Sequence, residues 1–128
     1  MLTIGLKYTA STTVTEDKTA RMMGSGTLDV FATPAMIALM EEAAYKAVES
    51  ALDAGCGSVG TYLDIKHTAA TPLGMTVRAE AELCEIDGRR LVFTLKAYDE
   101  AGLIGEGRHE RFIIQNEKFM ARTNLKKA

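Results

Sequence analysis

A glutamate in an otherwise apolar helical pattern is the first residue of this sequence that could do chemistry. The residues that share a helix face with Glu41, three and four positions away, are Ile37, Ala38, Ala44 and Tyr45. Glu42 differs, because it can pair with Lys46 four residues on. We therefore expect Glu41 to point toward a sheet or an interface, where partial desolvation strengthens a carboxylate as a base or a nucleophile. The alternative is a structural carboxylate satisfied by a backbone donor or an arginine.

A histidine and a threonine are the other candidates for chemistry. The alternating apolar residues that share the parity of His67 are Val59, Leu63 and Ile65. This alternation predicts that His67 ends a strand on the apolar face that covers the helix. Thr33 stands at the expected start of the helix, where free backbone N–H groups favour a carbonyl oxygen that is gaining negative charge. The structural alternatives are a satisfied core histidine and a helix N-cap.

The elements expected to position these residues form an antiparallel α+β domain. The helix begins at Pro34 after a Thr33 cap, runs for about 20 residues at helical spacing and ends near Gly55. The expected loop and strands, in chain order, are a strand over 5–15, a polar loop over 15–29, and strands over 58–67, 75–85, 91–98 and 103–119. Strands that follow one another through tight turns favour antiparallel pairing.

Asp87-Gly88 marks a hairpin between two of these strands. A tight two-residue turn would mix polar and apolar side chains on one face of the sheet. One extra, bulged residue gives a consistent apolar face instead. The pairs in that register are Leu83 with Phe93, Ala81 with Leu95 and Ala79 with Ala97. We therefore expect a bulged turn.

Composition and charge exclude several classes of function. The chain of 128 residues, 47% hydrophobic and 25% charged, suffices for one domain over 1–128. A formal charge of −2 gives no general attraction to nucleic acid or anionic lipid, and the basic tail with Arg122, Lys126 and Lys127 is expected to be solvated. No apolar run is long enough for a membrane span and no leader pattern opens the chain, so a cytoplasmic protein is expected.

The remaining cysteines and polar residues carry less information. Cys56 and Cys84 lack zinc-ligand spacing, so we expect no metal site. The segment with Arg108 and His109 lacks the strand-to-helix context of a phosphate-binding loop. We expect both residues at the surface or at a sheet edge.

Several short motifs in chain order form a recognisable pattern. They are Phe31-Ala32-Thr33 with the helix to Glu41, Gly60-Thr61, His67-Thr68-Ala69-Ala70-Thr71-Pro72 followed by Gly74, Gly88-Arg89-Arg90-Leu91, and His109-Glu110-Arg111. Over about residues 30 to 120 the sequence resembles the hot-dog-fold thioesterases, specifically the fluoroacetyl-CoA thioesterase-like group. The block that begins at His67 is the most specific part of this pattern.

The resemblance implies a fold, a site and an assembly. The fold is an α+β hot-dog fold, an antiparallel sheet of about five strands wrapped around one long central helix. Thr33, Glu41 and His67 would be the catalytic residues, and Gly60 and Arg111 would contact the substrate, an acyl-CoA. The resemblance also implies a homodimer with sheets joined edge to edge and active sites at the subunit interface, and it leaves open whether two dimers stack. It implies no cofactor.

The implied mechanism leaves one choice open. Glu41 either attacks the thioester carbonyl itself or activates a water for that attack, His67 assists proton transfer to the departing thiolate, and Thr33 orients the reacting groups. The fluoroacetate-specific member of the family has lid-forming phenylalanines before the helix, where this chain has Gly24-Ser25-Gly26-Thr27. We therefore expect hydrolysis of a small or medium acyl-CoA that is not fluoroacetyl-specific. A non-catalytic acyl-CoA-binding protein is the alternative, because hot-dog folds host several activities.

Overall fold

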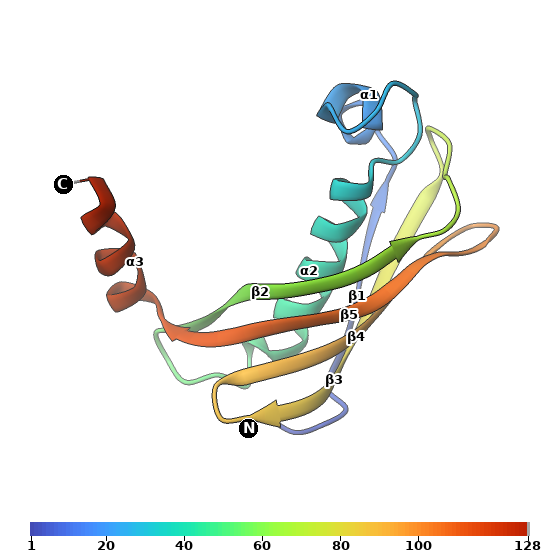
Figure 1. Cartoon of the computed structure of the whole chain (residues 1–128). Helices are drawn as coiled ribbons and strands as arrows, with labels where there is room; N and C mark the ends of the chain where they lie inside the picture. Colours follow the sequence, from blue (N-terminus) through green and yellow to red (C-terminus); the bar gives the residue numbers. More distant parts are fainter. Residues whose placement is uncertain (128) are drawn as a thin grey trace.

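Five antiparallel strands form one curved sheet that wraps a long helix (Figure 1). The computed structural model describes residues 1–127. The strands are β1 (Lys7–Thr13), β2 (Cys56–His67), β3 (Thr76–Asp87), β4 (Arg90–Asp99) and β5 (Gly102–Gln115). Their order across the sheet is β1-β3-β4-β5-β2, which leaves β1 and β2 at the two edges. The expected antiparallel α+β architecture is confirmed.

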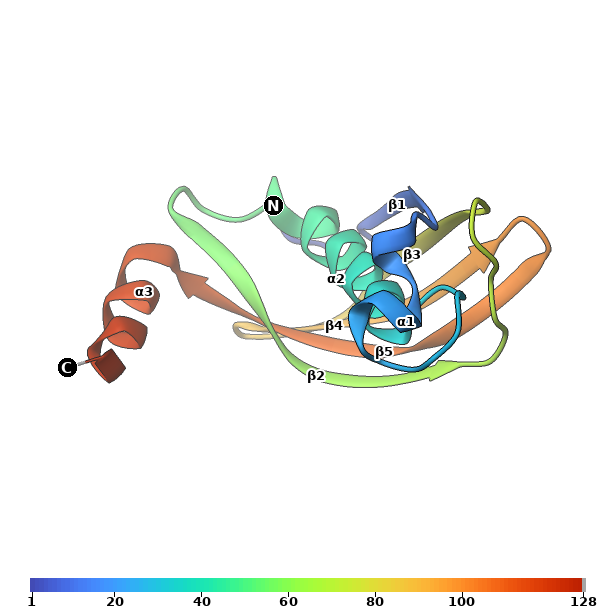
Figure 2. The same ribbon diagram turned by 90° about the horizontal axis from the view of Figure 1, so that it is seen from above.

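Helix α2 (Thr33–Glu49) supplies one side of the core and the inner face of the sheet supplies the other (Figure 2). Its buried residues recur at helical spacing: Met36, Leu39, Met40, Ala43, Ala44, Ala47 and Val48. They pack against apolar residues of the central strands, among them Leu83, Phe93 and Leu95. Burying this surface is the main stabilising term for a chain of this size.

The helix differs from its expected bounds at both ends. Ala32, not Thr33, is the N-cap, and Thr33 is the first helical residue. The Thr33 hydroxyl contacts His67 instead of capping an N–H group of the helix. The helix also ends earlier than expected, at Glu49. Gly55, with a φ of 80°, instead lies in the connection to β2.

The expected register of the β3–β4 hairpin is confirmed. Leu83 pairs with Phe93, Ala81 with Leu95 and Ala79 with Ala97. The extra residue, however, does not lie in the turn. Asp87 pairs with Arg90, and the register shifts between Leu83 and Glu85 instead. The turn is thus tight, and the bulge lies within β3.

Four short helical segments were not predicted from the sequence. The segment expected to be a polar loop holds η1 (Glu16–Lys18) and α1 (Ala20–Met23), because the Thr19 hydroxyl caps α1 and Gly24 ends it in the left-handed conformation. The strand expected to reach Phe119 ends at Gln115, and α3 (Asn116–Asn124) and η2 (Leu125–Lys127) follow it. None of the helices within residues 1–127 is long and apolar enough to cross a bilayer.

Candidate active site

Thr33 and His67 meet where the first turn of α2 lies against the end of β2. The Thr33 Oγ1 and His67 Nδ1 atoms are 2.7 Å apart. His67 Nε2 is buried and has no hydrogen-bond partner among residues 1–127. Burial lowers the pKa of His67 below its ordinary value of 6.5, with the Ala69 backbone acting in the opposite direction. The ring is therefore neutral at pH 7 and presents one unused nitrogen, as a proton-transfer residue requires.

Glu41 lies in a second polar group, held by an arginine. The Arg111 Nη1 atom is 3.6 Å from Glu41 Oε2, with side-chain exposures of 8% and 37% respectively. The Arg111 Nε group donates to Ser58 Oγ at 2.8 Å and Nη2 donates to the Ser58 carbonyl at 2.9 Å. The guanidinium is thus fixed on the side away from Glu41, and the carboxylate keeps a partly exposed surface for a reactant.

Gly60 makes room for the Glu41 carboxylate. A Cβ atom at position 60 would lie 2.7 Å from Glu41 Oε2 and 3.2 Å from His109 Cε1. The absence of a side chain therefore lets β2 approach the helix closely at this point. This places two sequence candidates, Gly60 and Arg111, beside Glu41.

His109 belongs to this group, contrary to the expectation of a surface position. Its side chain is fully buried, its Nδ1–H group donates to the Tyr62 carbonyl at 2.9 Å, and its Nε2 atom accepts from Arg111 Nη1 at 3.1 Å. Burial, with the charge of Arg111, lowers the pKa of His109, although the bond to Tyr62 opposes this. The pairing of β4 with β5 could have indicated this position, because His109 lies opposite Phe93 on the apolar face of the sheet.

A β-bulge in β2 brings both polar groups to the inner face of the sheet. The pairing with β5 shifts register between Gly60 and Tyr62. In a regular strand, residues an odd number of positions apart face opposite sides of the sheet. Because of the bulge, Gly60 and Ile65 both face inward, Gly60 toward Glu41 and Ile65 toward the core. The alternation expected to run unbroken from Val59 to His67 is therefore wrong at Val59, although His67 does face the helix.

The two polar groups are separate within one chain. Thr33 and Glu41 are eight residues apart on α2, a rise of about 12 Å at 1.5 Å per residue. Gly60, beside Glu41, and His67 are seven residues apart on β2, roughly 23 Å at the usual strand rise. The structure thus joins Thr33 to His67, and Glu41 to Gly60 and Arg111, but does not bring the three candidate catalytic residues together.

A buried threonine fixes the segment that follows His67. The Thr71 hydroxyl donates to Asp99 Oδ2 at 2.8 Å, and the Thr71 carbonyl accepts from the Phe31 N–H group at 2.8 Å. Asp99 Oδ1 accepts two further bonds, from the N–H groups of Ala101 and Gly102. The β4–β5 turn, the segment after β2 and the approach to α2 are therefore tied together beside the Thr33–His67 pair.

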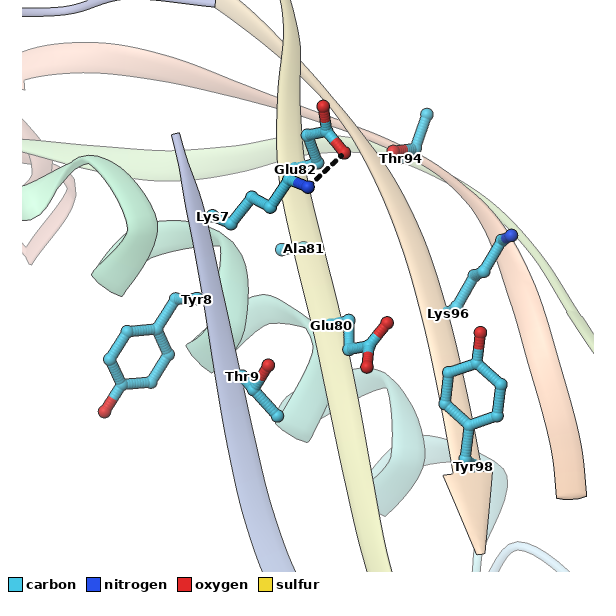
Figure 3. Close-up of a pocket in the computed structure, with 9 residues that line it drawn as sticks. All are labelled: Lys7, Tyr8, Thr9, Glu80, Ala81, Glu82, Thr94, Lys96 and Tyr98. Atoms are coloured by element: carbon cyan, nitrogen blue, oxygen red, sulfur yellow. Dashed lines mark ion pairs between the residues drawn. The ribbon is translucent and has the colours of Figure 1, made fainter. Parts of the chain in front are cut away.

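The outer face of the sheet offers no comparable site. A groove of about 380 Å³ lies there across β1, β3 and β4 (Figure 3). Its walls carry surface charges of both signs, including the ion pair of Lys7 with Glu82 at 3.6 Å, and none of the candidate residues lines it. Within residues 1–127, no cluster of three or more His, Cys, Asp or Glu side chains is placed to hold a metal ion.

Comparisons with known proteins agree with one another. Residues 14–117 match the family model described as fluoroacetyl-CoA-specific thioesterase. A fluoroacetyl-CoA thioesterase of Streptantibioticus cattleyicolor is 47% identical over 98 residues, which cover 77% of this chain and 70% of the relative.

Solved structures give the same result for the fold. A fluoroacetyl-CoA thioesterase superposes with a TM-score of 0.93 at 39% identity, covering 98% of each chain. A thioesterase superfamily member from Thermus thermophilus has a TM-score of 0.91 at 32% identity, covering 99% of this chain and 94% of that one. A hot-dog-like protein from Thermanaerovibrio acidaminovorans, at 22% identity with a TM-score of 0.87 over 98% of this chain and 93% of that one, shares the fold.

Proposed function

Because the chain belongs to the fluoroacetyl-CoA-specific thioesterase family, and is thus a thioester hydrolase with a hot-dog fold, we propose that it hydrolyses a small or medium acyl-CoA to the free acid and CoA. The observation that carries the proposal is His67, a neutral histidine with Nδ1 engaged by Thr33 and a buried, unpartnered Nε2. A structural histidine would have used both nitrogens.

The separation of the two polar groups supports a site shared between subunits. If two β2 edges pair antiparallel about a two-fold axis near Leu63, the Gly60 end of one strand lies beside the His67 end of the other. Glu41 and Arg111 of one subunit then face Thr33 and His67 of its partner. We therefore propose a homodimer with sheets joined edge to edge, in which each active site takes residues from both chains.

The proposed mechanism assigns each proton a place. When the Thr33 hydroxyl donates to Nδ1, the His67 proton resides on Nε2, where it hydrogen-bonds the departing thiolate sulfur. As this proton passes to sulfur, a proton from the water that the reaction consumes replaces it on the ring, so His67 is neutral again at the end of the cycle. The partner's Glu41 either takes a proton from the attacking water or attacks the carbonyl carbon itself, to form an anhydride that water then hydrolyses. The net reaction in both routes is thioester plus water to carboxylic acid plus thiol.

The segment before α2 supports a substrate other than fluoroacetyl-CoA. Residues 24–27 are exposed and consist of glycine, serine and threonine, without the lid-forming phenylalanines of the specialised enzyme. A lid of that kind closes over a very small acyl group. We propose that this chain accepts larger acyl groups, of small to medium length.

An acyl-CoA panel with a thiol-reactive dye tests this function. Wild type should release CoA, whereas Glu41→Ala and His67→Ala should each lower kcat by a factor of about 100 or more. Glu42→Ala is the matched control, because Glu42 is a neighbouring carboxylate paired with Lys46 at 2.9 Å. Saturable binding of acyl-CoA without release of CoA by wild type would favour a binding protein instead, and sole turnover of fluoroacetyl-CoA would overturn the broader acyl range.

Mixing the two inactive variants tests the shared site. After unfolding and joint refolding in equal amounts, half of the dimers are mixed, and each mixed dimer has one site with both residues intact. The mixture should therefore regain about a quarter of wild-type activity. Recovery of no activity from refolded mixed dimers would contradict a site built from two chains.

A further inference from the structure

A groove beside the C-terminal helix has the side chains of an anion site. Helix α3 stands off from the sheet at the end of β5 (Figure 1), and a groove of about 670 Å³ lies between them. Its charged walls are Arg89, Lys118 and Arg122, against the single carboxylate of Asp53. The groove is also lined by two phenylalanines, Phe112 and Phe119, whose exposed fractions are 41% and 37%.

The arginines of this groove are unlike the other arginines of the chain. Ion pairs with carboxylates hold the arginines at positions 21, 78, 90, 108 and 111. Arg89 and Arg122 pair with no described carboxylate, and both line the same groove. The basic residues Lys126 and Lys127 follow directly after α3. The chain as a whole is acidic, so this concentration of unpaired positive charge is a local feature.

A second groove extends from this region toward Glu41. It has a volume of about 380 Å³ and lies on the other side of α3, lined by Tyr45, Ser58 and Met120 among others. Cys56, Ile114 and Phe119 line both grooves. Ser58 accepts hydrogen bonds from Arg111, the residue that holds Glu41. The second groove therefore extends from the basic groove to the residue that anchors the partner of Glu41.

We infer that the groove between α3 and β5 binds the nucleotide end of CoA, that is, adenine with its 3′-phosphate and diphosphate. Arg89 and Arg122 pair with phosphate oxygens through their planar guanidinium groups. The exposed phenylalanine rings offer faces on which a base can stack. The pantetheine arm then runs through the second groove toward Glu41. This assignment rests on the proposed acyl-CoA substrate, and it gives α3 and the basic tail a role in place of the solvated one expected from the sequence.

The test is a double substitution with a charge-matched control. Arg89→Gln with Arg122→Gln should raise KM for an acyl-CoA by a factor of about ten or more, with kcat within a factor of two, because the lost contacts bind ground and transition states alike. The same acyl group on pantetheine, which lacks the nucleotide, should be hydrolysed equally by wild type and variant. The control, Lys18→Gln with Lys96→Gln, removes the same charge elsewhere and should leave KM for acyl-CoA unchanged.

Titration with adenosine 3′,5′-bisphosphate separates this inference from the proposed reaction. Wild type should bind the probe, and the Arg89→Gln, Arg122→Gln variant should bind it at least about tenfold more weakly. Equal binding by both proteins, or an equal loss with the lysine control, would overturn the nucleotide site. If the probe binds through the arginines and no acyl-CoA is hydrolysed, the site stands and the proposed reaction fails.

Discussion

The two histidines of the chain are both kept neutral by burial, yet their hydrogen bonds differ. His67 uses one nitrogen, toward Thr33, and its other nitrogen has no hydrogen-bond partner among residues 1–127. His109 uses both nitrogens, one toward the Tyr62 carbonyl at the bulge and one toward Arg111. His109 therefore orients Arg111, which in turn lies beside Glu41.

The lowered pKa values of His67 and His109 predict how stability changes with pH. Both groups have an ordinary pKa of 6.5 in the unfolded chain and a lower one in the folded chain. As the pH falls below 6.5, the unfolded chain binds protons first. The free energy of unfolding should then fall, by at most about 1.4 kcal/mol per pH unit for each group, until the folded group titrates.

His109→Gln isolates one of these two groups. Glutamine can still donate to the Tyr62 carbonyl and accept from Arg111, but it does not titrate. Urea unfolding between about pH 6.5 and pH 5 should show a shallower loss of stability in the variant than in wild type. The comparison at pH 8, where both histidines are neutral, serves as the baseline. Identical pH slopes would show that His109 does not titrate differently in the two states.

At the level of elements, the sequence predicted the sheet better than the ends of its strands and helices. Alternation on β3 and β4 gave the correct hairpin register, because one face of each strand must meet the core. The bulge at Gly60–Tyr62 could not be read in this way, since one extra residue reverses the alternation without a change in composition. Helix α3 was missed because none of its residues is buried, so it has no apolar core face to mark it.

The candidate site, too, could be predicted from the sequence only in part. Glu41 was identified by its apolar helical neighbours, and the structure places it beside a guanidinium on the inner face. Its separation from Thr33 follows from the helical rise along α2, whereas its distance from His67 depends on where β2 crosses α2. Local spacing carries no information on that crossing, because it is set by packing between segments far apart in the chain.

Gly107 is a position in β5 that has no room for a side chain. It pairs with Ile65 of β2 on one side and Leu95 of β4 on the other, and a Cβ there would collide with the backbone carbonyl of Asp64. Gly107→Ala should therefore destabilise the protein by about 3 kcal/mol or more, since backbone and not a flexible side chain must move.

Thermal or urea unfolding measures this effect, with Gly57→Ala as the control. At Gly57 the nearest atom to a new Cβ is the side-chain oxygen of Asn116, which can rotate away. The control should cost no more than about 1 kcal/mol. Equal stability losses in the two variants would argue against the close approach of β2 and β5 at Gly107.

For the whole molecule, the two edges of the sheet are unequal. β1 has 7 residues, whereas β2 has 12 and exposes Tyr62 and Leu63 by 47% and 43%. The proposed dimer covers the longer edge. Leu63→Arg should therefore give a monomer, and activity should fall with the dimer because each proposed site needs two chains.

Sedimentation and the acyl-CoA assay together check this prediction. Leu103→Arg is the control, because Leu103 is a leucine of similar exposure, 40%, at the start of β5, six residues from His109, which pairs with Leu63. It should remain dimeric and active. A fully active monomer of Leu63→Arg would contradict the shared site, and an intact dimer would contradict the proposed edge.

The free edge of β2 also affects how the chain reaches its final state. Before the proposed dimer forms, a newly folded subunit presents at β2 a long row of unpaired backbone groups flanked by apolar side chains, a template on which other extended chains can add. Assembly and aggregation thus compete for the same surface. Dilution, which slows the meeting of subunits, and heat, which frees extended segments of other chains, shift that competition toward aggregation.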